Sequence, residues 1–108
     1  MSQYYAAIEM KITELLHCSP VTAELFGPEL ILVYHLIPPS ILPTDGLYIP
    51  GSVLVSCKRT MLRLRCGIGN RGWDRVYDLM HPNSIDALTA AANEILGAIN
   101  ERKRCGLA

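Results

Sequence analysis

Apolar residues recur at spacings of three and four in two segments, one near each end of the chain, and this pattern predicts two amphipathic helices. The first helix covers residues 3–17, with Ser2 as its N-cap. Its apolar stripe consists of Tyr5, Ile8, Ile12, Leu15 and Leu16. The second helix begins at Asn83 or Ser84 and ends in the basic run 102–104, before Gly106. Its apolar stripe consists of Ile85, Leu88, Ala92, Ile95, Leu96 and Ile99.

Residues 30–37 are apolar, β-branched and aromatic without alternation, which favours a strand covered on both faces over a buried helix. Residues 52–67 alternate, but the apolar parity changes at residues 58–60. This change indicates either one bulged strand or a hairpin, and no Gly, Asn or Asp is present to form a tight turn. In both interpretations Arg63 and Arg65 point away from the core.

The remaining segments are less regular. Ser19 and Pro20 can start a short helical turn that Gly27 and Pro28 end. Residues 73–80 fit a helix or a strand, and we favour the helix. Residues 38–51 form a proline-rich loop, with a short edge strand at 47–49, and its apolar residues indicate that it folds back over the core.

These elements predict one small α+β domain over residues 1–108, with a short tail at 105–108. A chain of 108 residues is long enough to bury a core and too short for two domains. The two terminal helices are expected to pack on one face of a small, mostly antiparallel sheet.

Composition excludes some classes of protein. Half of the residues are hydrophobic and 19% are charged, which is incompatible with intrinsic disorder. No apolar run approaches the ~20 residues of a membrane span. The first residues contain no basic group and reach Glu9 where a secretion signal would be apolar, so we expect no export and a cytoplasmic location. The four cysteines are then expected to be free thiols, with Cys57 and Cys66 in the core.

No motif points to a cofactor or a reaction. Residues 67–72 match G-x-G-x-x-G, but no parallel βαβ unit follows, so we expect a connecting loop there rather than a nucleotide site. The histidines and cysteines lack metal-ligand spacing. We therefore expect no cofactor and no metal, and favour a non-catalytic protein while leaving an enzyme open.

The zero net charge conceals two oppositely charged halves. Residues 1–57 contain one base and five acids, whereas residues 58–108 contain nine bases and five acids. Within the second half, one basic stretch contains an aromatic residue and supplies the predicted partner-binding residues. These are Arg63, Arg65, Arg71, Trp73 and Arg75.

Two patterns favour a homo-oligomer. A negative and a positive region on one protomer can associate head to tail, and a closed arrangement of such contacts makes a ring. The expected outer face of the last helix is rich in alanine (Ala87, Ala90, Ala91 and Ala98), which suggests a neighbouring helix. The order of elements is also similar to the general layout of small phage tail-completion proteins that assemble as rings, an analogy at the level of the fold.

Three functions therefore remain open. The first is a self-associating interaction or assembly module that presents the basic strand and loop to an acidic protein surface or to another copy. The second is a small nucleic-acid-binding protein that uses the same residues, with Trp73 stacking on bases. The third is an enzyme or ligand-binding protein with a pocket under the proline-rich loop, lined by Tyr34, His35, Tyr48 and His81.

Overall fold

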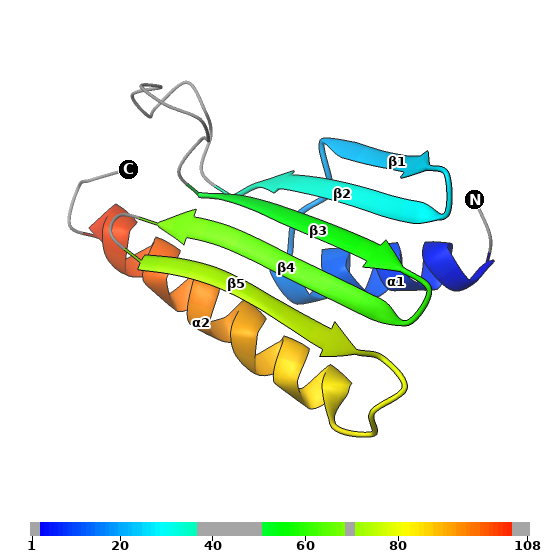
Figure 1. The fold of residues 1–108 in the computed structure, drawn as a ribbon. Coiled ribbons are helices and arrows are strands. Elements are labelled where there is room, and N and C mark those ends of the chain that lie inside the picture. The colour runs from blue at the N-terminus through cyan, green and yellow to red at the C-terminus, as the bar shows by residue number, and fades with distance from the viewer. Residues whose placement is uncertain (1–2, 37–50, 69–70, 105–108) are drawn as a thin grey trace.

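The structure is a computed structural model that describes residues 3–36, 51–68 and 71–104 (Figure 1). The chain forms a helix, five strands and a second helix. In order these are α1 (Gln3–Leu16), β1 (Thr22–Phe26), β2 (Glu29–His35), β3 (Ser52–Lys58), β4 (Met61–Ile68), β5 (Arg71–Asp78) and α2 (Ser84–Arg104).

The strands form one antiparallel sheet in the order β1-β2-β3-β4-β5, so every strand pairs only with its neighbours in the chain. Both helices lie on the same face of this sheet (Figure 1). The predicted fold class, a small α+β domain with its helices on one face of an antiparallel sheet, is confirmed.

The core lies between the sheet and the helices. Alternate residues of β2, β3 and β4 point toward the helices, where spacings of three and four bring the apolar stripes of α1 and α2 against them. The sheet contributes Leu30, Leu32, Tyr34, Val53, Val55, Cys57, Leu62, Leu64, Cys66 and Trp73. The helices contribute Ile8, Ile12, Leu16, Leu88, Ala92, Ile95 and Ile99. Both predicted helices are therefore confirmed, and so is the strand over residues 30–35 of the predicted segment 30–37; β2 ends at His35, and Ile37 lies outside the described residues.

Two segments predicted as helical are strands. Residues 22–26 form β1, because Gly27, with a φ of 61°, turns the chain back and lets β1 pair with β2 from Thr22↔Val33 onward. Of the segment 73–80, for which we favoured a helix over a strand, residues 73–78 belong to β5, which covers 71–78 and pairs with β4 over its whole length. In both segments hydrogen bonding to a neighbouring strand outweighs the local helical signals.

The sequence predicts that both faces of the strand at 30–37 are covered, and the structure differs on this point. Exposure alternates along β2, so only one of its faces is covered rather than both. The alanines of α2 divide in a similar way, because Ala91 is buried and Ala98 half-buried, whereas Ala87 and Ala90 are exposed as predicted.

Residues 52–67 form a hairpin, which settles the choice between a hairpin and a bulged strand. The loop between β3 and β4 contains only Arg59 and Thr60, and Arg59 has a φ of 59°. A positive φ at the first of two loop residues is the pattern of a type II′ turn, which usually has glycine there. A left-handed conformation at a residue other than glycine costs about 1–2 kcal/mol.

Two tyrosines of α1 hold this turn. The Tyr4 hydroxyl donates to the Arg59 carbonyl at 2.8 Å, and the Arg59 N–H donates to the Tyr5 hydroxyl at 3.2 Å. The Tyr5 hydroxyl also donates to the Pro28 carbonyl at 2.6 Å. Tyr5 therefore fastens the β1–β2 turn and the β3–β4 turn to the start of α1, which helps to offset the strain at Arg59.

The connection between β2 and β3 is closed at its base, where the Leu36 N–H donates to the Gly51 carbonyl at 3.1 Å. The rest of the predicted proline-rich loop, including the strand expected at 47–49, lies outside the described residues, as does the expected tail at 105–108. Neither of the two helices in the described part of the chain has the length and apolar character needed to span a membrane.

Candidate interaction surface on the open sheet face

The face of the sheet turned away from the helices is not covered by any described helix or strand (Figure 1). We call it the open face. It consists of Thr22, Glu24 and Phe26 from β1, Glu29, Ile31, Val33 and His35 from β2, Ser52, Leu54, Ser56 and Lys58 from β3, Met61, Arg63 and Arg65 from β4, and Asp74, Val76 and Asp78 from β5. These residues alternate along each strand with those of the core.

Charge on the open face is arranged in bands that follow the strands. Glu24 and Glu29 make an acidic band on β1 and β2. The basic residues Lys58, Arg63 and Arg65 lie on β3 and β4. Asp74 and Asp78 make a second acidic band on β5. A basic band therefore lies between two acidic ones, an arrangement that becomes visible only when the strand register is known.

Asp74 holds the two arginines of the basic band. Its Oδ1 accepts from Arg63 Nε and its Oδ2 from Arg63 Nη2, both at 2.9 Å, while Arg65 Nε lies 3.7 Å from Oδ1. The hydrogen bonds from Arg63 lower the pKa of Asp74, and the same bonds raise the pKa of Arg63. One carboxylate thus serves two guanidinium groups, which leaves positive charge on this part of the face.

Apolar side chains occupy the space between the charges. Ile31, Val33 and Leu54 on the central strands are half-buried. Phe26, Met61 and Val76 are 60%, 46% and 55% exposed. Exposed apolar groups that are surrounded by polar residues are typical of surfaces that bind a partner.

The predicted partner-binding residues do not form one surface. Arg63 and Arg65 lie together on the open face, as expected. Trp73 is only 4% exposed and belongs to the core, because β5 is a strand that places it opposite Cys66. Arg75 pairs with Leu64 and so lies on the helical side, while Arg71 pairs with Ile68 at the start of β5.

The predicted pocket residues are also separated. Tyr34 is buried under α1, where its hydroxyl lies 3.0 Å from Thr13 Oγ1 and burial raises its pKa. His35, the next residue, lies on the open face with Nδ1 2.9 Å from Ser52 Oγ. His81 follows β5 at the opposite end of the sheet, and Tyr48 lies outside the described residues. The described residues therefore do not bring this set together.

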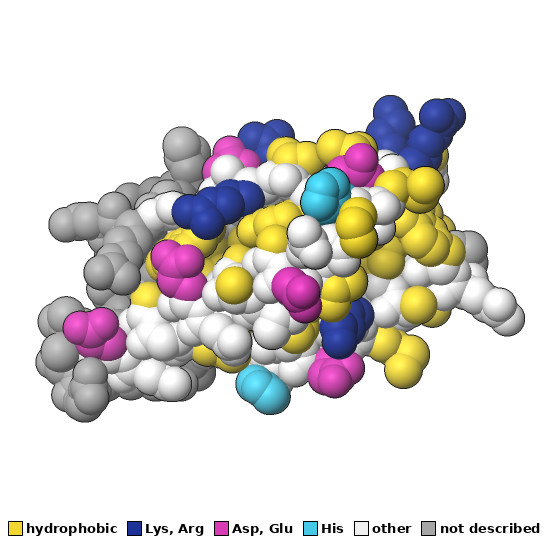
Figure 2. All heavy atoms as spheres, turned by 90° about the horizontal axis from the view of Figure 1, so that it is seen from below, with side chains coloured by type: hydrophobic (Ala, Val, Ile, Leu, Met, Phe, Trp, Pro, Cys, Tyr) yellow, Lys and Arg dark blue, Asp and Glu magenta, His cyan; other side chains and the backbone are white. Residues whose placement is uncertain are grey.

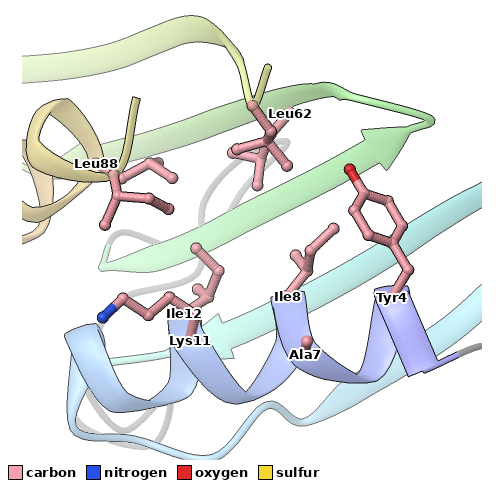
Figure 3. A pocket seen from close by; sticks show the side chains of 9 residues that line it. Tyr4, Ala7, Ile8, Lys11, Ile12, Leu62 and Leu88 are labelled. Atoms are coloured by element: carbon pink, nitrogen blue, oxygen red, sulfur yellow. The ribbon is translucent and has the colours of Figure 1, made fainter. Parts of the chain in front are cut away.

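A groove instead lies between α1 and α2 on the helical side (Figures 2 and 3). Its volume is about 240 Å³. Tyr4, Ala7, Ile8, Lys11 and Ile12 of α1, Leu62 of β4, Leu79, and Ile85 and Leu88 of α2 line it. Lys11 supplies the single charged group of the lining, and the Tyr4 hydroxyl, which donates to the Arg59 carbonyl, is the other polar group among apolar side chains.

The cysteines do not form a reactive or metal-binding centre in the described part of the chain. Burial raises the pKa of Cys66 to about 12 and also raises the pKa of Cys57, so both thiols stay protonated at neutral pH. Cys18 is half-buried and its Sγ lies near the carbonyls of Ser19 and His35. Within residues 3–36, 51–68 and 71–104, no three His, Cys, Asp or Glu residues gather as a metal site.

G-x-G-x-x-G at residues 67–72 also has a different setting from a nucleotide site. Gly67 pairs with Gly72 at the end of the β4–β5 hairpin, where a strand follows instead of a helix. The motif is therefore mostly strand rather than the expected connecting loop, and no helix N-terminus is available there to bind a phosphate.

No protein-family model, no curated protein and no solved structure shows a significant match to the chain.

Proposed function

We propose that this protein is a non-enzymatic interaction module that self-associates through its open face. The observation that carries the proposal is the charge pattern of the open face, in which the exposed side chains Phe26, Met61 and Val76 lie among the acidic and basic bands. Apolar groups supply binding energy on burial, and charges of both signs set the orientation of a partner.

The same surface supports nucleic acid less well. A phosphate backbone would gain from Lys58, Arg63 and Arg65, but it would also meet the acidic bands on both sides of them. Trp73 is buried and cannot stack on a base. A protein surface that itself contains both charges fits the bands better.

The experiment replaces Arg63 and Arg65 together by glutamate and measures mass by light scattering from micromolar to millimolar protein. The wild type should grow in mass with concentration, and the double variant should stay monomeric at the same concentrations. Arg75→Glu is the matched control, because this exposed arginine lies on the helical side of the neighbouring strand. It should associate as the wild type does.

A wild-type protein that is monomeric throughout, or a double variant that associates normally, would overturn the proposal. An oligonucleotide titration at low salt tests the alternative function, nucleic-acid binding. Binding that weakens steeply with added salt would favour the nucleic-acid function over self-association.

A further inference from the structure

We infer that the partner on the open face is a second copy of this chain, bound face to face about a two-fold axis that runs parallel to the strands, midway between β2 and β3. This inference rests on the proposed function and adds the arrangement of the two copies. It follows from the strand register, which fixes where each open-face residue lies across the sheet.

The register arranges the open face in transverse rows. One row contains Glu24, Ile31, Ser56 and Arg63 in the order β1 to β4. The next row contains Phe26, Glu29, Lys58 and Met61 in the same order. A third row contains Thr22, Val33, Leu54 and Arg65. Each row therefore has two residues, from β1 and β2, on one side of the line between β2 and β3, and two residues, from β3 and β4, on the other side.

A two-fold axis between β2 and β3 places β1 over β4 of the second copy and β2 over β3 of the second copy, within the same rows. In the first row Glu24 then faces Arg63 of the second copy. In the second row Glu29 faces Lys58 of the second copy. Symmetry repeats each contact, so the interface contains four pairs of opposite charge.

The apolar residues match under the same operation. Val33 meets Leu54 of the second copy near the axis, and Phe26 meets Met61 of the second copy at the rim. Phe26 and Met61, which are 60% and 46% exposed in the single chain, would both become covered. One arrangement thus pairs charges of opposite sign and buries Phe26 and Met61, whereas Val76 on β5 lies outside the four overlapping strands.

Other two-fold arrangements are less favourable. An axis parallel to the strands but centred on β3 places Lys58 over Lys58 of the second copy. An axis that crosses the strands places β4 over β4, so that Arg63 and Arg65 face the same arginines. Like charges in contact oppose association, so the bands select the axis between β2 and β3.

The size of the contact indicates a weak dimer. Four strands spaced at about 4.8 Å, each about seven residues long, give a contact on the order of 1,000 Å² in total. This area is at the lower end for specific interfaces. Stacked sheets also cross at about 30°, so residues near the axis stay closer to the second copy than residues at the rim. Two-fold contacts are closed, so assembly ends at a dimer rather than a head-to-tail ring.

The test uses two single variants, Glu24→Arg and Arg63→Glu, and their mixture. In each variant alone, two like-charged pairs replace two attractive ones, so dimerisation should weaken by about tenfold or more. In a mixed dimer the two introduced side chains, which have opposite charges, face each other across one contact. The native Glu24 and Arg63 face each other across the symmetry-related contact. Sedimentation of the equimolar mixture should therefore recover a dimer with an affinity close to that of the wild type.

The outcomes separate this inference from the proposed function. Recovery in the mixture supports the two-fold arrangement. A wild type that self-associates, with variants that are both weakened and a mixture that does not recover, would overturn the arrangement and leave the open face as the docking surface. A monomeric wild type would overturn both, and circular dichroism of each variant checks that the fold is intact.

Discussion

The two faces of this sheet are made by the same strands and differ in almost every physical property. Along β4, Leu64 is 2% exposed beneath the helices, while the Arg65 side chain next to it is 48% exposed on the open face. One face is apolar and covered by α1 and α2, whereas the other alternates charge in bands. Of two neighbouring positions in one strand, one therefore contributes to the core and the other belongs to the proposed association surface.

This separation has a limit, because the open face is not purely polar. Ile31, Val33 and Leu54 are half-buried there, although no described helix or strand covers them. The central question is whether the open face contributes to the stability of the single chain or only to the contact with a partner. Three perturbations compare the two faces, the first on both faces and the other two on the helical side, in order of decreasing expected effect.

The largest effect is expected from truncating leucines on the two faces. Leu64→Ala removes a buried side chain next to Val55 and should lower the free energy of unfolding by about 2–5 kcal/mol. Leu54→Ala removes the same atoms from the open face and should cost about 1 kcal/mol or less. Urea denaturation at low protein concentration measures both values.

The comparison is completed by measuring association of the two leucine variants. Leu54→Ala should dimerise several-fold more weakly, because Leu54 lies near the proposed axis. Equal losses of stability for Leu54→Ala and Leu64→Ala would mean that the open face acts as a second core and that the contrast between the faces is wrong.

A smaller effect is expected at Tyr5, which adds polar contacts to the helical side. Tyr5→Phe removes the hydrogen bonds to the Pro28 carbonyl and from the Arg59 N–H, and should lower the free energy of unfolding by about 1–3 kcal/mol. Tyr77→Phe is the control, since no hydrogen bond joins the Tyr77 hydroxyl to any described residue. Equal thermal stability of the two variants would contradict the prediction and show that the Tyr5 hydrogen bonds do not stabilise the fold.

The smallest effect concerns proton binding on the helical side. Burial raises the pKa of the Cys66 thiol from 9.0 to about 12, so above pH 9 the unfolded chain loses this proton more readily than the folded one. Stability should therefore fall as the pH rises through this window, by about 1 kcal/mol between pH 9 and pH 10. Urea denaturation at each pH should show a shallower decline for Cys66→Ala, and an identical slope would contradict the prediction.

The sequence predicts correctly those helices and strands in which the same spacing of apolar residues recurs over several helical turns or strand positions. The stripes of α1 and α2 and the apolar run of β2 are of this kind, as is the outward orientation of Arg63 and Arg65. The sequence favours a helical turn after Ser19 and Pro20 and a helix at 73–80, and both predictions are wrong where β1 (22–26) and β5 (71–78) form, because edge strands depend on pairing with β2 and β4 rather than on a local pattern.

The candidate site was predicted only in part for the same reason. Trp73 was expected beside Arg63 and Arg65, but the strand pairing of β5 turns it toward the core. The acidic bands were not predicted, because Glu24 and Asp74 are distant in sequence and only the register places them on either side of the basic residues. The groove between α1 and α2 likewise depends on how the helices pack.

The hydrogen bond between Leu36 and Gly51 has a consequence for how this chain tolerates changes in length. The chain leaves β2 and enters β3 at adjacent points, so the span between them is short whatever the number of residues in between. Each doubling of a connecting loop costs only about 0.6 kcal/mol. Residues could therefore be removed from this connection, or a foreign segment grafted into it, while the register between β2 and β3 stays the same.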